Sequence, residues 1–189
     1  MANFQYILLE GLPGAGKTTL LTKLHASTLG LSEIPDVGNP KTLPPEFKVD
    51  WRWIVDVECL KSSLAKYAHN DVVIQERGYL SVLACHYALE KNGLEKTYLQ
   101  VEKSIANDVH NGRLTLPTLT VVATLTPEDS LHRQPGTVLS MWHNPVLLAD
   151  IQSYYIRYAT QPLFGEKVVC IASESLQSFI MNELTGDSR

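Results

Sequence analysis

The sequence predicts an α/β fold of three layers, in which helices cover both faces of a mostly parallel five-stranded sheet. Three observations lead to this prediction. Short apolar runs without polar alternation indicate buried strands. Segments with helical spacing separate one run from the next, as crossover helices do in parallel sheets. The length of 189 residues suits one domain with its own core, so we expect a single domain over residues 1–189.

The first strand and helix flank a glycine-rich turn. Residues 4–9 form an apolar run that stops at Glu10-Gly11, and leucines recur at helical spacing from residue 20 onward. Four prolines lie between residues 32 and 48. This stretch therefore predicts a very short second strand followed by a long irregular loop, a kind of loop that often has a function.

The middle of the chain predicts another helix and a third strand. An apolar stripe between residues 51 and 68 predicts a helix. The β-branched run at residues 71–75 then predicts a buried strand. The stripe consists of Ile54, Val57, Leu60, Leu64 and Tyr67.

The second half predicts two amphipathic helices at about residues 79–89 and 94–109, broken at Asn92-Gly93. A strand follows at residues 119–125. Two helices then begin with a capping side chain and a proline, at Thr126-Pro127 and at Asn144-Pro145. A last strand at 168–172 and a short helix from Ser173 complete the predicted fold.

The composition excludes several classes of protein. A hydrophobic fraction of 44% with 19% charged residues is typical of a globular domain. The 16 basic residues form no cluster and face 20 acidic ones, which disfavours a nucleic-acid partner. The three cysteines lack C-x-x-C spacing, and no run of 18 apolar residues occurs in the sequence. The first residues include no basic region and only a short apolar run, so we expect no leader peptide. We therefore expect a cytoplasmic protein without a membrane partner.

Residues 11–18 match G-x-x-x-x-G-K-[ST] between a predicted strand and a predicted helix, which is the context of a phosphate-binding P-loop. The glycines let backbone amides turn toward phosphates at a helix N-terminus. Lys17 is expected to reach the β- and γ-phosphates of ATP, and Thr18 to offer its hydroxyl to Mg²⁺. The predicted cofactor contacts are Gly11, Gly14, Ala15, Gly16, Lys17, Thr18 and Thr19.

Two further segments carry a family resemblance. Residues 73–81 read Val-Ile-Gln-Glu-Arg-Gly-Tyr-Leu-Ser, and residues 117–133 run from Pro-Thr-Leu through an apolar strand to Thr-Pro-Glu and Arg133. With the P-loop, they resemble the thymidylate kinase and deoxynucleoside kinase group of P-loop kinases. The guanine-reading Asn-Lys-x-Asp segment of GTPases is absent. The resemblance implies a P-loop NTPase fold with a short lid at about 133–144, and assembly as a homodimer.

The resemblance also implies roles for individual side chains. Glu76 would help hold Mg²⁺ or accept a proton, and Arg77 would clamp the acceptor or the transferred phosphoryl group. Asp36 would be the general base, and Arg133 the lid cation. The alternatives are a surface ion pair for Glu76-Arg77 and a solvated loop acid for Asp36.

Arg52 and Trp53 are the predicted acceptor contacts, because related kinases meet the acceptor at the start of this helix. An aromatic face stacks on a flat acceptor, and a guanidinium binds phosphate. The alternative is a core tryptophan beside a helix-end arginine.

The predicted function is an ATP- and Mg²⁺-dependent transfer of the γ-phosphoryl group to a nucleoside, a nucleoside monophosphate or a similar small acceptor. Arg133 is the one arginine in the lid candidate, where this kinase group commonly carries several. A regulatory protein that binds nucleotide but transfers little is therefore an alternative. A specialised metabolite or antibiotic hydroxyl is an alternative acceptor.

Overall fold

A computed structural model describes residues 5–27, 31–34, 50–67, 72–133 and 143–185. Within these ranges five strands form one sheet in the order β2-β3-β1-β4-β5, and every neighbouring pair is parallel. The predicted parallel sheet is therefore confirmed. The strands are β1 (Gln5–Gly11), β2 (Leu31–Ile34), β3 (Val72–Glu76), β4 (Leu119–Thr124) and β5 (Lys167–Ala172).

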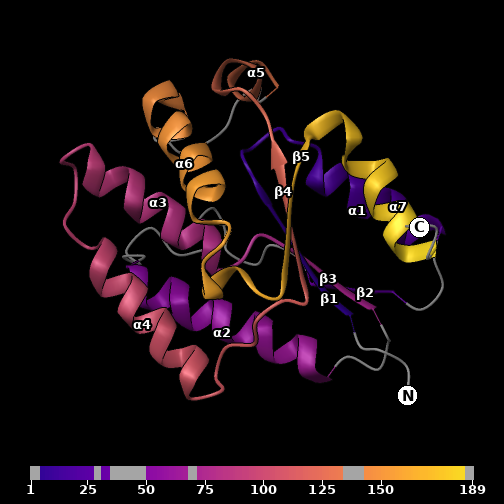
Figure 1. Cartoon of the computed structure of the whole chain (residues 1–189), viewed down its shortest axis with the longest axis horizontal. Coiled ribbons are helices and arrows are strands. Elements are labelled where there is room, and N and C mark those ends of the chain that lie inside the picture. Colours follow the sequence, from indigo (N-terminus) through magenta and orange to yellow (C-terminus); the bar gives the residue numbers. More distant parts are fainter. Residues whose placement is uncertain (1–4, 28–30, 35–49, 68–71, 134–142, 186–189) are drawn as a thin grey trace, which may run out of the picture.

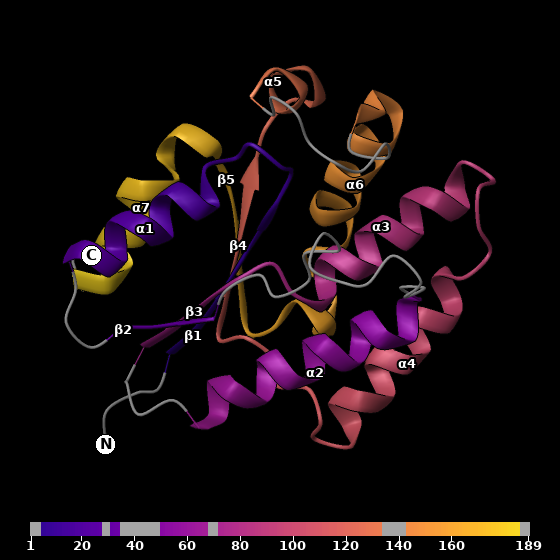
Figure 2. The same ribbon diagram turned by 180° about the vertical axis from the view of Figure 1, so that it is seen from behind.

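Helices cover the sheet on both faces, as Figures 1 and 2 show from opposite sides. On one face lie α1 (Lys17–Ser27) and α7 (Leu176–Thr185). The other face carries α2 (Trp51–Tyr67), α3 (Tyr79–Lys91), α4 (Tyr98–His110) and α6 (Pro145–Tyr158). The short α5 (Pro127–His132) follows β4, while the 3-10 turns η3 (Pro162–Phe164) and η4 (Ser173–Ser175) flank β5.

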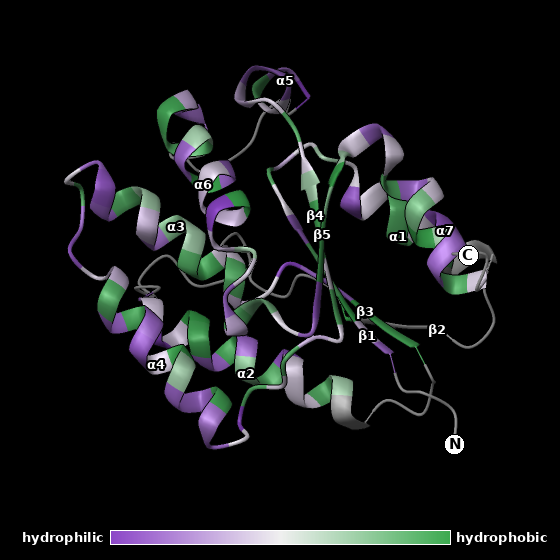
Figure 3. Ribbon diagram, viewed as in Figure 1, coloured by the Kyte–Doolittle hydropathy of each residue, from purple (hydrophilic) through white to green (hydrophobic). Residues whose placement is uncertain are grey.

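Alternate residues of the central strands enter different cores. Ile7 and Leu9 of β1 pack with leucines of α1 and with Leu176 of α7. Leu8, between them, packs with α3 and α6 on the opposite face. Figure 3 shows the resulting hydrophobic sheet between the helical layers. Burial on both faces explains why the strands read as continuous apolar runs.

The two predicted helix starts are confirmed. The Thr126 hydroxyl accepts a hydrogen bond from the backbone N–H of Asp129 at 3.1 Å, and Asn144 caps α6 in the same way through Val146 and Leu147. Each cap satisfies backbone donors that the first helical turn leaves unpaired. These caps set where α5 and α6 begin.

The predicted helix is confirmed as α2, but part of its apolar stripe is exposed. Leu60 and Leu64 are 60% and 52% exposed. The sheet side of α2 instead buries Glu58 and Lys61, which form an ion pair at 3.0 Å, together with the small Ala65. A paired and hydrogen-bonded charge tolerates burial, so apolar spacing alone does not identify the buried face of this helix.

Several expectations lie outside the described residues, namely the loop at 35–49 with Asp36 and most of the lid candidate, residues 134–142. Among the residues that are described, no helix combines the length and the apolar character needed to cross a membrane.

Candidate active site

The predicted phosphate loop joins the carboxyl end of β1 to the N-terminus of α1. Gly11 and Gly14 have φ angles of +124° and +77°, in the region that favours glycine. A Cβ at Gly11 would collide with the carbonyl oxygen of Ala123 in β4. At Gly14 a Cβ would lie 3.0 Å from the Cβ of Arg133. Close packing against the β4-α5 corner therefore requires small residues in this loop.

The Lys17 side chain contacts the first two residues of the loop. Its Nζ donates hydrogen bonds to the carbonyl oxygens of Gly11 and Leu12, both at 2.9 Å, and the residue is 3% exposed. On the other side of the loop, the Ser130 hydroxyl donates to the carbonyl oxygen of Pro13 at 2.8 Å. The ammonium group and α5 thus hold the loop from two directions.

Thr18 and Glu76 meet at the end of the neighbouring strand. The Thr18 hydroxyl donates to both carboxylate oxygens of Glu76, at 2.8 and 2.9 Å. The parallel register of β1 and β3 pairs Leu9 with Glu76, so Glu76 leaves β3 beside the start of the loop. A hydroxyl and a carboxylate are the hard oxygen donors that Mg²⁺ prefers. These two residues therefore fit the Mg²⁺ ligands that the sequence predicts.

Arg77 follows Glu76 in a left-handed backbone conformation, with φ of +55°. Its N–H donates to the carbonyl oxygen of Leu9 at 3.0 Å, and the residue is half-buried. Few non-glycine residues adopt this conformation, and those that do cluster at functional sites. The backbone thus turns sharply where the sequence predicts the acceptor clamp.

Glu10 is a site residue that the sequence did not assign. The residue is fully buried, and its carboxylate accepts hydrogen bonds from the N–H of Gly78 at 2.9 Å and the hydroxyl of Tyr155 at 3.0 Å. The Ser81 hydroxyl is a further donor, at 2.5 Å. Glu10 therefore caps the N-terminus of α3, where Gly78 has no side chain to do so. A single acid closing an apolar strand is the signal that could have identified it.

Charged groups from the phosphate loop and from the end of β3 both act on the Glu10 carboxylate. Burial raises the pKa of the Glu10 carboxyl above its usual range, and the Ser81 hydrogen bond opposes this shift. The positive charges of Arg77 and Lys17 also lower this pKa, so both cations act on the same carboxylate. Burial raises the pKa of Tyr155 well above its ordinary value, so its hydroxyl keeps the proton that it donates to Glu10.

Four other predicted site residues differ in their exposure and in their contacts. Arg52 is exposed, and its guanidinium lies 4.8 Å from the ring centre of Trp51 in its own helix. Trp53 is half-buried near the start of α2, and Thr19 is exposed on α1. The Arg133 guanidinium donates to the Ser173 hydroxyl at 3.1 Å. Roles in binding for these four residues stay predictions.

Comparison with models of protein families and with curated protein sequences finds no match to this chain. Solved structures do match. Deoxyadenosine kinase from M. mycoides with bound dATP superposes with a TM-score of 0.67 and 15% identity, over 95% of this chain and 98% of that chain. The same kinase with the product dCMP and a flexible dCDP gives a TM-score of 0.70 and 15% identity, over 96% of this chain and 99% of that one.

Thymidylate kinase from Candida albicans is also similar, with a TM-score of 0.66 and 16% identity, over 99% of this chain and 93% of that chain. The likeness extends over nearly the whole chain at low sequence identity. The resemblance that the sequence motifs indicate is therefore confirmed at the level of the fold. This chain has the α/β fold with a parallel sheet that these nucleoside and nucleotide kinases share.

Proposed function

We propose that this protein transfers the γ-phosphoryl group of ATP to a nucleoside, a nucleoside monophosphate or a similar small acceptor. The contact between Thr18 and Glu76 is the observation that carries the proposal. It brings a hydroxyl and a carboxylate together at the N-terminus of α1, one residue after Lys17, whose ammonium contacts the phosphate loop. Phosphoryl transfer needs positioning and charge stabilisation of this kind more than covalent chemistry.

The phosphate loop and Lys17 form the donor side of the proposed site. Backbone amides at the start of α1 attract phosphate oxygens, because the helix N-terminus carries partial positive charge. The Lys17 ammonium exchanges its carbonyl partners for phosphate oxygens when ATP binds. Thr18 and Glu76 would hold Mg²⁺, which supplies neutralisation of phosphate charge when it is bound.

Arg77 forms the acceptor side. An oxygen of the acceptor attacks the γ-phosphorus, the bond to the bridging oxygen breaks, and ADP leaves with that electron pair. The Arg77 guanidinium stabilises the phosphoryl oxygens during the transfer. A hydroxyl acceptor gives its proton to a base, for which Asp36 and Glu76 are the candidates. A monophosphate acceptor is already ionised and needs no base.

The acceptor class rests on the similar structures. The mycoplasma kinase is described with dATP, dCMP and dCDP, and the yeast enzyme is a thymidylate kinase. We extend nucleoside or nucleotide chemistry from those proteins to this one. A different small hydroxyl compound would require the same donor side and a differently shaped acceptor pocket.

A turnover assay tests the proposal. Purified protein is incubated with Mg²⁺, ATP and, in turn, each common nucleoside and deoxynucleoside and its monophosphate, and ADP is measured by a coupled assay. We expect ADP that depends on at least one acceptor and falls to background in Lys17→Ala. ADP formation that is independent of every acceptor would identify a hydrolytic ATPase instead. Binding of ATP without ADP formation would identify a regulatory protein.

A further inference from the structure

The peptide unit between Arg77 and Gly78 is held at both of its polar atoms. Its carbonyl oxygen, on Arg77, accepts hydrogen bonds from the Lys61 ammonium and the Gln75 side-chain amide, each at 2.8 Å. Its N–H, on Gly78, donates to the Glu10 carboxylate at 2.9 Å. The peptide dipole therefore lies between a cation and an anion that come from different elements of the fold.

The groups that hold the carbonyl oxygen are themselves buried and connected. Lys61 is 1% exposed and pairs with Glu58 at 3.0 Å. Gln75 is also 1% exposed, donates to the other oxygen of Glu58 at 3.1 Å, and accepts a hydrogen bond from the Tyr6 hydroxyl at 2.7 Å. A connected buried network of this kind resists rearrangement, because breaking one of its hydrogen bonds leaves a buried polar group without that partner.

This arrangement allows one orientation of the peptide. Rotating it by half a turn would aim the carbonyl oxygen at the Glu10 carboxylate and the N–H at the Lys61 ammonium, and both contacts are repulsive. The same peptide fixes the backbone angle ψ of Arg77, whose φ of +55° an unsupported residue rarely adopts. Gly78 packs closely on β1, since a Cβ there would lie 2.9 Å from Cδ1 of Leu8.

We propose that Lys61, together with its partner Glu58, is a positioning residue for Arg77. The pair sets the backbone turn from which the guanidinium reaches the transferred phosphoryl group. This inference rests on the proposed function, because it assigns Lys61 a role through Arg77. Lys61 touches neither substrate in this account, and its contribution to the rate depends on the presence of the Arg77 side chain.

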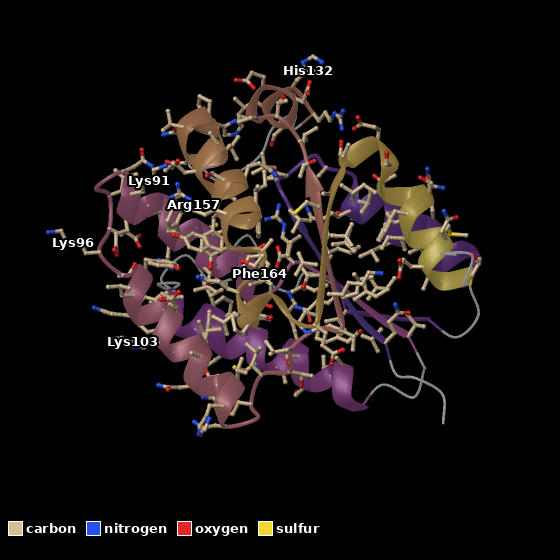
Figure 4. The ribbon with its side chains drawn as sticks, in the orientation of Figure 1. Lys91, Lys96, Lys103, His132, Arg157 and Phe164 are labelled. Carbon is tan, nitrogen blue, oxygen red and sulfur yellow. The ribbon has the colours of Figure 1, made fainter. Side chains whose placement is uncertain are left out.

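The test needs a variant that removes the pair without burying a lone charge. Lys61→Met alone would leave the buried Glu58 carboxylate without the Lys61 charge and destabilise the fold, whereas neutralising both members of a buried pair is tolerated far better. The variant is therefore Glu58→Gln/Lys61→Met. Its control is Lys103→Met on α4, where the side chain is exposed and points away from the protein (Figure 4).

The experiment is a double-mutant cycle with Arg77→Gly, measured as kcat for the best acceptor and as Kd for Mg·ATP. Glu58→Gln/Lys61→Met should lower kcat about 10- to 100-fold and change the Kd by less than about twofold. In the Arg77→Gly background the same change should lower kcat no further, and Lys103→Met should match the unmodified protein. An unaltered kcat, or an equal loss in the Arg77→Gly background, would overturn the inference.

A crystal structure of Glu58→Gln/Lys61→Met provides a readout that needs no turnover. We expect the Arg77-Gly78 peptide to be rotated and the guanidinium to be displaced. The same backbone angles at Arg77 as in the unmodified protein would overturn the positioning role. If the unmodified protein transfers no phosphoryl group, the proposed function fails, and the crystal structure still decides whether the pair holds this peptide.

Discussion

Lys17→Met is expected to lower kcat/KM by about 1000-fold or more, because the ammonium is the fixed positive charge closest to the phosphate loop. Methionine keeps the unbranched stem, so the buried packing of this position is preserved. Turnover of the best acceptor is the measurement. The midpoint of thermal unfolding, Tm, should change by only a few degrees, so a loss of activity would not reflect unfolding.

The matched control is Lys23→Met on the same helix. Lys23 is exposed and donates to the Gln177 side chain at 2.9 Å, away from the loop. The control removes an equal charge from α1 and should leave turnover within about twofold, since exposed pairs contribute little. A Lys17→Met protein as active as the Lys23→Met protein would remove the loop from the mechanism.

Arg77→Gly is expected to lower kcat by about 100- to 1000-fold while leaving the fold intact. Glycine adopts the φ of +55° observed at this position without strain, so the backbone turn survives the loss of the side chain. Relief of backbone strain stabilises the folded variant, whereas the greater freedom of glycine in the unfolded chain destabilises it, so the two effects oppose each other. The free energy of unfolding, measured in urea, should therefore stay within about 1 kcal/mol of the unmodified protein.

Comparing the loss of kcat with the change in the free energy of unfolding distinguishes a functional role of Arg77 from a structural one. A structural ion pair at the end of β3 would lose stability and activity together. A clamp on the phosphoryl group loses rate alone, because its partners belong to the substrate. Arg77→Gly with normal turnover would contradict the clamp, whatever its stability.

Much of the fold follows from local sequence. The central strands β1 and β4 are buried on both faces and read as apolar runs, so they stand out without any knowledge of their partners. The capped starts at Thr126 and Asn144 place α5 and α6 to the residue, because capping depends on neighbours two or three positions away. The phosphate loop is recognisable for the same reason. Its glycines, lysine and threonine all lie within eight consecutive residues, 11–18.

The rest of the site depends on contacts that spacing does not reveal. Glu10 meets Tyr155, which lies 145 positions away, and Lys61 reaches the Arg77 carbonyl oxygen from another element. The spacing of residues along α2 does not reveal that Leu60 and Leu64 are exposed while Lys61 is buried, because a paired lysine and glutamate look like a solvent-facing pair when only the sequence is read. Asp36 stays a prediction, because it lies outside the described residues.

Calorimetric titration with Mg·ATP tests the central claim most directly, because donor binding by the loop at residues 11–18 precedes every later step. We expect saturable binding of one nucleotide per chain, with Lys17→Met binding more weakly and Lys23→Met binding as the unmodified protein does. Absence of measurable binding of any magnesium-complexed purine triphosphate to the folded protein would contradict the account.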